Sequence, residues 1–459
     1  MSRSDITARL STTRTPVTAP KAPGLVPVRK VRSGIGEIAI LFILDVLAAV
    51  VVTVATRAAW PIVLLPLALA AAGLYRARLH FSALDDLPRV ILAIAVAAAA
   101  LHWLTPFPGP SRTVLGVLLA AVLLARTTGY SLLRAHRRSS PGRAAIIVGS
   151  GDLAVRVATA LREDRSCGLT PVGFVGPRAL AQRDLPVLAP VTDLERAVTR
   201  YRPLHLIVAY PAMPDSELVT RLRHCRRLGV TVHVVPRLHE LAVGSRGADL
   251  VRGIPLTRLR PEPVQQRRWR LKRLVDVVGA ATALVLLSPL LLLCAVAVKV
   301  ESGRHAVIFR QERVTRDGAP FTIRKFRSLT PVDEAESCRR WNIDTDARVG
   351  RVGRMLRNSS LDELPQLVNV LTGSMSLVGP RPERPHFADL FGRVYNGYPD
   401  RHRVPAGITG WAQIHGLRGD TSIEDRVRFD NYYIEHWSLG LDLKIMLRTL
   451  GSMLHKPRG

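Results

Sequence analysis

The chain has 459 residues, and its 65 Lys and Arg against 36 Asp and Glu give a formal net charge of +29. Because hydrophobic residues fill 47% of the positions, this composition argues against a disordered chain and against an ordinary soluble enzyme. Aromatic residues make up only 5%, which argues against nucleic-acid binding, where basic side chains alternate with exposed rings. A chain that is both basic and apolar indicates a membrane protein.

The first 135 residues predict a basic arm followed by a membrane bundle. Residues 1–34 are rich in Arg, Lys, Pro, Ser and Thr without periodicity, which is typical of disorder. Residues 35–135 predict four transmembrane helices, since each apolar stretch approaches the roughly 20 residues that cross a bilayer. These stretches lie near 36–56, 60–75, 88–104 and 113–133. Arg126 in the fourth would have to face the bundle or reach toward the interface. A soluble helical bundle is the alternative.

The distribution of positive charge predicts the orientation of this bundle. Lys and Arg gather before the first stretch, between the second and third, and after the fourth, whereas the two other loops carry only Arg57 and Arg112. Cytoplasmic loops of membrane proteins carry such an excess. We therefore expect a multi-pass membrane protein whose parts after residue 135 lie on the cytoplasmic face.

Residues 142–262 predict a Rossmann-like α/β domain. Buried-strand patterns lie at 144–148, 204–208 and 230–235. Gly149 and Gly151 form a turn that could hold a phosphate at a helix N-terminus. The second strand, however, ends at Gly176-Pro177 without the acid that holds a ribose hydroxyl. A membrane-anchored nucleotide-binding oxidoreductase or sensor using this turn is therefore the alternative function.

A fifth apolar run spans residues 277–298 and contains no charge. Ser288-Pro289 interrupts it, and the proline frees one carbonyl that a nearby Ser hydroxyl could satisfy. Two structures fit this pattern: a kinked spanning helix, or a helix that enters the membrane and returns to the same face. A crossing would place the Arg-rich residues 300–459 outside, against the charge rule.

After this run, basic residues bracket a pair of acids. Arg313, Lys325 and Arg327 lie on strand-like segments, and Arg357 and Arg381 flank the pair on either side. This set suits a polyanionic substrate, because Lys and Arg bind phosphate oxygens. A carboxylate with phosphate oxygens can hold Mg²⁺, and a second carboxylate can attack phosphorus.

The pair itself, Asp362-Glu363, also fits a capping box that begins at Ser360. In that register Pro365 falls inside the helix, where its ring and missing N–H conflict with the hydrogen-bond ladder. A helix that starts nearer Asp362 tolerates the proline better and places both carboxylates at a positively polarised end.

Taken together, these segments resemble a known family. Residues 267–459 are similar to the catalytic domain of the bacterial sugar transferases, the monotopic polyprenyl-phosphate phosphoglycosyl transferases. The resemblance rests on eight ordered motifs: Lys272-Arg-Leu-Val-Asp276, Ser288-Pro289, Phe309-Arg-Gln311, Lys325-Phe-Arg-Ser328, Ser360-Leu-Asp-Glu-Leu-Pro-Gln366, Met375-Ser-Leu-Val-Gly-Pro-Arg-Pro382, Pro405-Ala-Gly-Ile-Thr-Gly-Trp-Ala-Gln413 and Asp430-Asn-Tyr-Tyr433. Four spans and a Rossmann-like (CoA-binding-like) domain before it resemble the long form, which starts exopolysaccharide, capsule or O-antigen assembly.

The resemblance implies an α/β membrane protein with three structured parts: a four-helix transmembrane bundle, a Rossmann-like domain and a catalytic domain with a re-entrant helix at about 275–299. It implies transfer of a sugar-1-phosphate, a hexose-1-phosphate being favoured, from a UDP-sugar to undecaprenyl phosphate at the bilayer. UMP is released and Mg²⁺ is required. It leaves open a homodimer, and it implies no nucleic-acid partner.

The resemblance also implies roles for individual residues. Asp362 matches the nucleophile that carries the phospho-sugar, and Glu363 matches the metal ligand. The residues matching phosphate or nucleotide contacts are Lys325, Arg327, Arg357 and Arg381. Asp430 matches a recurrent acid without an assigned role, grouped here with the substrate contacts. The chain departs from the family at positions such as Val368, where the family usually has Trp. Because of these departures, the resemblance does not identify the donor sugar.

Overall fold

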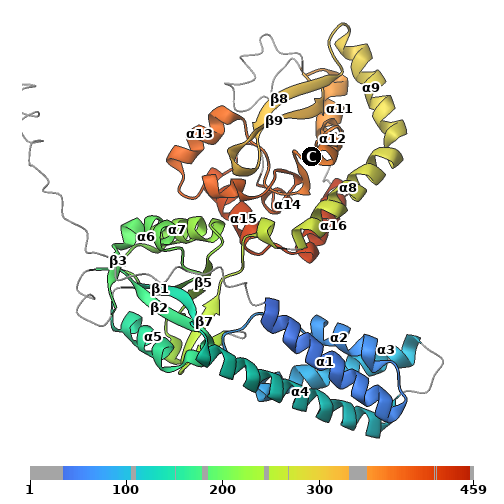
Figure 1. Ribbon diagram of the computed structural model, residues 1–459. Coiled ribbons are helices and arrows are strands. Elements are labelled where there is room, and N and C mark those ends of the chain that lie inside the picture. The colour runs from blue at the N-terminus through green and yellow to red at the C-terminus, as the bar shows by residue number, and fades with distance from the viewer. Residues whose placement is uncertain are drawn as a thin grey trace, which may run out of the picture. The chain divides into compact units, whose positions relative to one another are not determined.

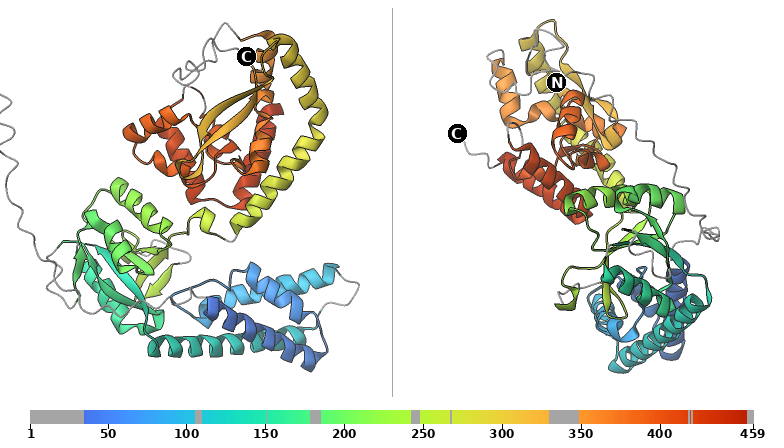
Figure 2. Two further views of the ribbon diagram at one scale, coloured as in Figure 1. Left: turned by 45° about the horizontal axis from the view of Figure 1, so that its top comes forward. Right: turned by 90° about the vertical axis from the view of Figure 1, so that its left-hand side faces the viewer.

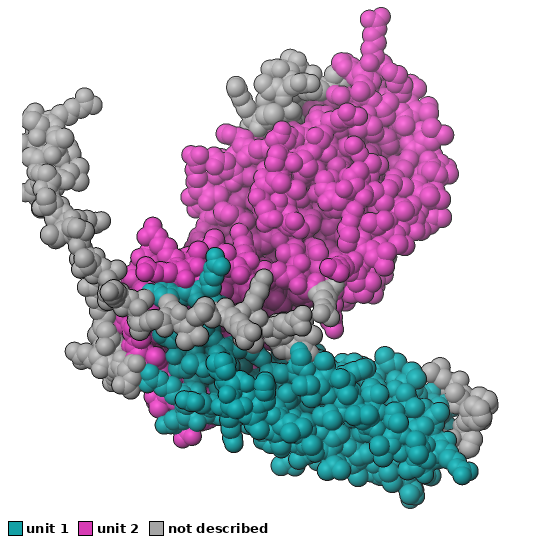
Figure 3. Space-filling view, viewed as in Figure 1, with its two compact units in different colours: residues 1–145, 160–172, 201–203 teal, residues 146–159, 173–200, 204–459 magenta. Residues whose placement is uncertain are grey.

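The computed structural model describes residues 35–104, 110–149, 151–177, 185–241, 248–266, 268–329, 349–417, 419 and 421–454. The predicted arm 1–34 lies outside these residues. The described chain divides into two compact units (Figure 3). One unit comprises residues 1–145, 160–172 and 201–203, and the other comprises 146–159, 173–200 and 204–459. These two units do not coincide with the domains expected from the sequence. The expected domain boundaries stay a prediction.

All four apolar stretches of the N-terminal part form helices (Figure 1). These are α1 (Ile35–Thr56), α2 (Pro61–Ala71), α3 (Ala83–Leu104) and α4 (Arg112–Ser139). By length and composition, α1 and α4 are the two described single helices long and apolar enough to cross a membrane. Helix α2 has only 11 residues, fewer than the roughly 17 that the shortest spans use. The structure therefore supports two apolar spans, and the bundle of four spans stays a prediction.

Arg126 of α4 faces the interior of this bundle, which is one of the two orientations that the sequence left open. Its side chain is 1% exposed. Its Nη2 and Nε donate to the two carboxylate oxygens of Asp45 on α1, at 2.6 and 3.2 Å. Tyr75 donates a further hydrogen bond to Asp45, and Arg126 donates to Tyr130. An ion pair with saturated hydrogen bonds offsets the cost of burying each charge. No pattern in the sequence identifies Asp45 as the partner of Arg126.

The Rossmann-like part is built on a seven-stranded sheet of order β3-β2-β1-β4-β5-β7-β6. Its strands are β1 (Arg143–Gly149), β2 (Leu169–Val175), β3 (Val187–Ala189), β4 (His205–Ala209), β5 (Thr231–Val234), β6 (Asp249–Val251) and β7 (Ile254–Arg258). Its helices are α5 (Asp152–Glu163), α6 (Leu194–Tyr201) and α7 (Asp215–Arg227). The pairs β2–β3 and β4–β5 are parallel, whereas β7 joins β5 and β6 antiparallel. The three predicted strands are confirmed, and the sheet is mostly parallel as expected.

The C-terminal part begins with a bent pair of helices, α8 (Arg268–Leu286) and α9 (Ser288–Ser302), inclined by 65°. The hydroxyl of Ser288 donates to the Val285 carbonyl at 2.8 Å. This is the carbonyl that Pro289 leaves without its helical N–H partner, so the expected Ser compensation is confirmed. The bend fits both a broken span and a re-entrant loop. The choice between them stays a prediction.

A two-stranded antiparallel hairpin, β8 (Ile308–Val314) and β9 (Pro320–Phe326), lies at the centre of this part. Figures 1 and 2 show α8 and α9 along one side of the hairpin and α13 on the other. The remaining elements are α11 (Arg351–Ser359), α12 (Gln366–Thr372), β10 (Ser376–Val378), α13 (Pro385–Val394), β11 (Gly407–Thr409), α14 (Trp411–Ile414), α15 (Ile423–Glu435) and α16 (Leu439–Leu454). Buried apolar residues of α8, β9 and α12 pack together, which fixes α12 beside the hairpin.

Candidate active site

The two predicted catalytic acids lie on a short turn between α11 and α12. Ser360 ends α11 in the left-handed conformation, with φ 59°, and residues Leu361–Glu363 form one turn of 3-10 helix. The Ser360 side chain makes no capping hydrogen bond to a described residue, so the capping-box interpretation is wrong. The helix start expected near Asp362 is also displaced, because α12 begins only at Gln366. Pro365 then stands at the N-cap, where a missing N–H costs nothing.

Glu363 is clamped by two cations from other elements. Its Oε1 accepts hydrogen bonds from Lys325 Nζ at 2.7 Å and from Arg381 Nη2 at 2.8 Å, and its Oε2 accepts from Arg381 Nη1 at 3.3 Å. Lys325 comes from β9, and Arg381 follows β10. Burial alone would raise the pKa of Glu363, but the charges of Arg381 and Lys325 outweigh it and hold this pKa well below its ordinary value. The Glu363 carboxylate is therefore ionised at neutral pH.

Asp362 has a different environment from its neighbour. Its carboxylate accepts no hydrogen bond from the described residues. Burial raises its pKa above the ordinary value for Asp, and Glu363 adds to this, while Lys325, Arg357 and Arg381 act in the opposite direction. Three cations therefore act on the charge of Asp362, while no described residue occupies its oxygens with a hydrogen bond. Within the described part of the chain, the carboxylate of Glu363 is held and that of Asp362 is open.

Arg357 is brought toward the pair by close packing of α11. Its Nε donates to the Ser328 hydroxyl at 2.8 Å, just beyond β9. Gly353, one turn earlier, permits this approach, since a Cβ there would lie 2.2 Å from the Ser328 carbonyl oxygen. The charge of Arg357 opposes the rise in the pKa of Asp362, so we group this cation with the pair. We call Asp362, Glu363, Lys325, Arg357 and Arg381 the acid–cation cluster.

Two other predicted site residues lie in different surroundings. Arg327 donates from Nε to the Ala306 carbonyl at 2.7 Å, and its guanidinium lies over the Phe309 ring, so it joins the ends of the β8–β9 hairpin. Asp430 of α15 is 2% exposed and pairs with Arg401. The structure records no contact of either side chain with the acid–cation cluster among the described residues. Their predicted contacts with substrate stay predictions.

Arg401 is the residue that the sequence analysis missed. It is 1% exposed, and it donates to both Asp430 and the Arg381 carbonyl. No local pattern distinguishes it among the 65 basic residues of the chain. Only the burial and partners of this guanidinium, which depend on the fold, reveal its position.

The cluster offers oxygen ligands of the kind that Mg²⁺ prefers. Glu363 Oε2 accepts one long hydrogen bond of 3.3 Å, and the Asp362 carboxylate accepts none, in both cases from described residues. With respect to the described residues, Oε2 of Glu363 and both oxygens of Asp362 can therefore accept a further ligand. Mg²⁺ commonly uses one or two carboxylates together with substrate phosphates and water. The described residues contain no group of three or more acidic, His or Cys side chains that could hold a metal alone. The acid–cation cluster therefore fits a Mg²⁺ ion that is bound jointly by these carboxylates and by a phosphate ligand.

The glycine turn of the Rossmann-like part has a packing explanation. A Cβ at Gly149 would lie 2.3 Å from the Ala209 carbonyl oxygen and 2.9 Å from the Ala154 Cβ, so β1 and α5 need a glycine there. Gly151 faces open space, but α5 carries Asp152 in its first turn. The negative charge of Asp152 already interacts with the positively polarised N-terminus of α5. The nucleotide-binding turn stays a prediction without structural support.

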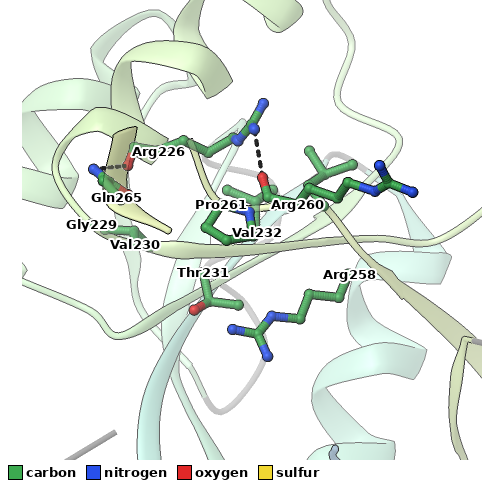
Figure 4. A pocket seen from close by; sticks show the side chains of 10 residues that line it. Arg226, Gly229, Val230, Thr231, Val232, Arg258, Arg260, Pro261 and Gln265 are labelled. Carbon is green, nitrogen blue, oxygen red and sulfur yellow. Dashed lines mark hydrogen bonds between the residues drawn. The ribbon is translucent and has the colours of Figure 1, made fainter. Parts of the chain in front are cut away.

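A small pocket in the same part also lacks the features of an anion site. It is lined by Arg226, Arg258 and Arg260, among others, near the start of β5. Figure 4 shows the three guanidinium groups pointing in different directions rather than toward one centre. Arg226 is already engaged by the Arg260 carbonyl and by Glu435. The pocket therefore brings no converging set of charges together.

Comparison with known proteins identifies a family for this chain. Residues 267–456 match the family model described as bacterial sugar transferase. A UDP-glucose:undecaprenyl-phosphate glucose-1-phosphate transferase of Xanthomonas campestris pv. campestris is 32% identical over 355 residues, which cover 74% of this chain and 73% of the relative. The enzyme of that name from Escherichia coli (strain K12) is 39% identical over 252 residues, 54% of each chain, so the match spans about half of that relative.

A third relative carries a different sugar in its name. The UDP-N-acetylgalactosamine-undecaprenyl-phosphate N-acetylgalactosaminephosphotransferase of Aeromonas hydrophila is 38% identical over 235 residues, covering 51% of this chain and 54% of the relative. The family match and the two helices that are apolar enough to cross a membrane together indicate the class of a membrane-associated sugar transferase. The chain belongs to the bacterial sugar transferase family.

Proposed function

We propose that this protein transfers a sugar-1-phosphate, favouring a hexose-1-phosphate, from a UDP-sugar to undecaprenyl phosphate. The names of the relatives support this donor and acceptor. The observation that carries the proposal is the pairing of an open carboxylate, Asp362, with a carboxylate that Lys325 and Arg381 hold ionised. The reaction would be the first membrane step in assembling an exopolysaccharide, capsule or O-antigen.

The acid–cation cluster supports a two-step displacement. In the first step, an oxygen of Asp362 attacks the phosphorus that bears the sugar, the bond from that phosphorus to the UMP oxygen breaks, and UMP leaves with the electron pair. In the second step, a phosphate oxygen of undecaprenyl phosphate attacks the same phosphorus, and the bond to Asp362 breaks. Sugar and phosphorus end on the lipid as a diphosphate, and the Asp362 carboxylate is restored.

The remaining residues would bind and orient the charged substrate. Lys325 and Arg381 already lie within 2.8 Å of Glu363 Oε1 and can also donate to oxygens of the diphosphate. Arg357 would contribute a third cation from α11. Mg²⁺, when bound by Glu363 together with phosphate oxygens, would neutralise charge that develops on the leaving phosphate.

A donor screen tests this proposal. Membranes containing the full chain would be incubated with undecaprenyl phosphate and, in parallel, with radiolabelled UDP-glucose, UDP-galactose and UDP-N-acetylgalactosamine. We expect one donor to give both UMP and a labelled lipid in equal amounts. If no UDP-sugar gives either product, the proposed function is wrong. The preferred donor would also identify the sugar, which the relatives leave open because their names differ in it.

We further propose that α8 and α9 form a re-entrant hairpin and that the acid–cation cluster lies on the cytoplasmic face of a multi-pass inner-membrane protein. The 65° bend at Ser288 and the exposed apolar side chains of both helices support this arrangement. UDP-sugars are cytosolic and the lipid phosphate lies at the interface, so a hairpin would hold the carboxylates near headgroup depth.

A cysteine-labelling experiment distinguishes the hairpin from a crossing helix. In a variant whose four cysteines are replaced by Ser, Arg304→Cys places a thiol just beyond α9. We expect this thiol to resist an impermeant reagent added outside intact cells and to react after the membrane is opened. Arg57→Cys, in the exposed segment after α1, is the control that should react from outside. Labelling of Arg304→Cys from outside would show that α8 and α9 cross the membrane.

A further inference from the structure

The segment that carries Arg381 is held in an unusual way. Arg381 lies between Pro380 and Pro382, which have no backbone N–H to donate. The segment is instead fixed through three successive carbonyl oxygens. Gly407 N donates to Pro380 O at 2.9 Å, Arg401 Nη2 donates to Arg381 O at 2.9 Å, and Arg313 Nη1 donates to Pro382 O at 3.1 Å. The orientation of the Arg381 side chain toward Glu363 therefore depends on groups that bind its backbone.

The Arg401 guanidinium is in turn fixed by Asp430. Its Nε and Nη2 donate to Asp430 Oδ2 at 3.1 and 2.7 Å, and its Nη1 donates to the Tyr398 hydroxyl at 3.1 Å. The side chains of Arg401 and Asp430 are 1% and 3% exposed. A buried guanidinium whose nitrogens all bond in one plane has little freedom to move. Its donation to the Arg381 carbonyl is thereby fixed in direction as well as distance.

We infer that Asp430 is a positioning residue that acts on the reaction through Arg401 and the Arg381 backbone. Asp430 orients Arg401, Arg401 holds the Arg381 carbonyl, and Arg381 clamps Glu363 beside Asp362. The surroundings of Asp430 favour positioning over direct binding of substrate, because its buried carboxylate would repel a phosphate and already pairs with Arg401. The effect of this relay on turnover rests on the proposed function.

A second buried ion pair in the same part provides a matched control. Glu262 and Arg403 have side chains that are 2% and 1% exposed, and their Oε1–Nη1 distance is 2.9 Å. Among the described residues, Glu262 has no hydrogen bond to the segment 380–383. Glu262→Gln thus disturbs a pair of the same chemistry and burial, and in the part of the chain that the structure describes neither Glu262 nor Arg403 has a hydrogen bond to Asp430, Arg401 or the Arg381 carbonyl.

The relay predicts a coupled loss of activity. With the donor found in the screen, Asp430→Asn is expected to lower kcat/KM by about 10- to 100-fold in the wild-type background. In an Arg381→Ala background, the same change should lower it less than about 3-fold, because the group that it positions is gone. Asp430→Glu, which keeps the charge, should restore part of the loss. Equal fold-losses of Asp430→Asn in the two backgrounds would overturn the relay.

Hydrogen–deuterium exchange tests the same inference without turnover. Asp430→Asn should speed exchange in the peptide that contains Gly407, whose N–H binds the Pro380 carbonyl, while Glu262→Gln should leave that peptide unchanged. Unchanged exchange in Asp430→Asn, or the same increase in both variants, would overturn the relay even if the wild-type protein is inactive with every donor. Tyr398→Phe, which removes one partner of Arg401, replaces Asp430→Asn if that variant fails to fold.

Discussion

Asp362→Asn is expected to reduce transfer of the phospho-sugar by at least about 1,000-fold. Asn has nearly the shape of Asp but no anionic oxygen, so it cannot form the bond to phosphorus that the proposed mechanism requires. The change should leave folding intact, because the Asp362 carboxylate accepts no hydrogen bond from the described residues. The rate of labelled lipid formation from the preferred UDP-sugar and the thermal unfolding of the full chain in detergent would check both parts.

The covalent step has a direct readout as well. With a donor labelled in the phosphate next to the sugar and no lipid acceptor, wild-type protein should retain label after denaturation, and Asp362→Asn should not. Asp389→Asn is the control, since among the described residues Asp389 pairs only with Arg393, in an exposed ion pair of α13. Turnover near the wild-type rate in Asp362→Asn would remove this residue from the role of nucleophile.

Proton binding by Asp362 should also shape the pH dependence of this activity. Burial raises the pKa of Asp362 above that of an exposed Asp. Only the ionised carboxylate can attack phosphorus, so the rate falls as pH decreases through this raised pKa. The acid limb should therefore begin at a higher pH than the ordinary value of about 3.9 would give.

The sequence was most informative where one residue has a local consequence. Pro289 leaves one backbone carbonyl without its N–H partner, and the hydroxyl of Ser288 can reach that carbonyl. The compensating hydrogen bond is therefore predictable from the Ser-Pro dipeptide alone. The alternating patterns around residues 309–314 and 321–328 likewise predict two strands, which the structure shows as β8 and β9. Such effects act over one or two turns of the chain and need no knowledge of the fold.

Long-range pairs were beyond this kind of prediction. The sequence left two orientations open for Arg126, toward the bundle or toward the interface, and its partner Asp45 lies 81 residues away in a different helix. Arg401 and Asp430 are separated by 29 residues, and their partnership depends on how η9 (Pro399–Arg403) packs against α15. The helix start near Asp362 failed for a related reason. Ser360 takes a left-handed conformation that ends α11, so the acids lie on a separate turn.

Glu363→Gln is expected to weaken both the fold and the reaction. The amide leaves Lys325 and Arg381 without the anion that both now contact within 2.8 Å. Hydrogen bonds to charged groups contribute about 1.5–3 kcal/mol each, and these side chains are partly exposed, so we expect a loss of about 2 kcal/mol in the free energy of unfolding. Turnover should fall by about 100-fold or more, because the cations lose their arrangement and Mg²⁺ loses its expected ligand.

The pH dependence of this loss separates the ion pairs from simple packing. The folded-state pKa of Glu363 lies below its unfolded value, so its contribution to stability is fully present above about pH 4.3 and is lost as pH falls toward the folded-state pKa. The difference in unfolding free energy between wild type and Glu363→Gln should therefore be largest near neutral pH and shrink below pH ~4. Glu312→Gln, at an exposed position of β8, should show no such difference. A difference for Glu363→Gln that is constant from pH 7 to pH ~3 would mean that Lys325 and Arg381 do not stabilise the fold through this carboxylate.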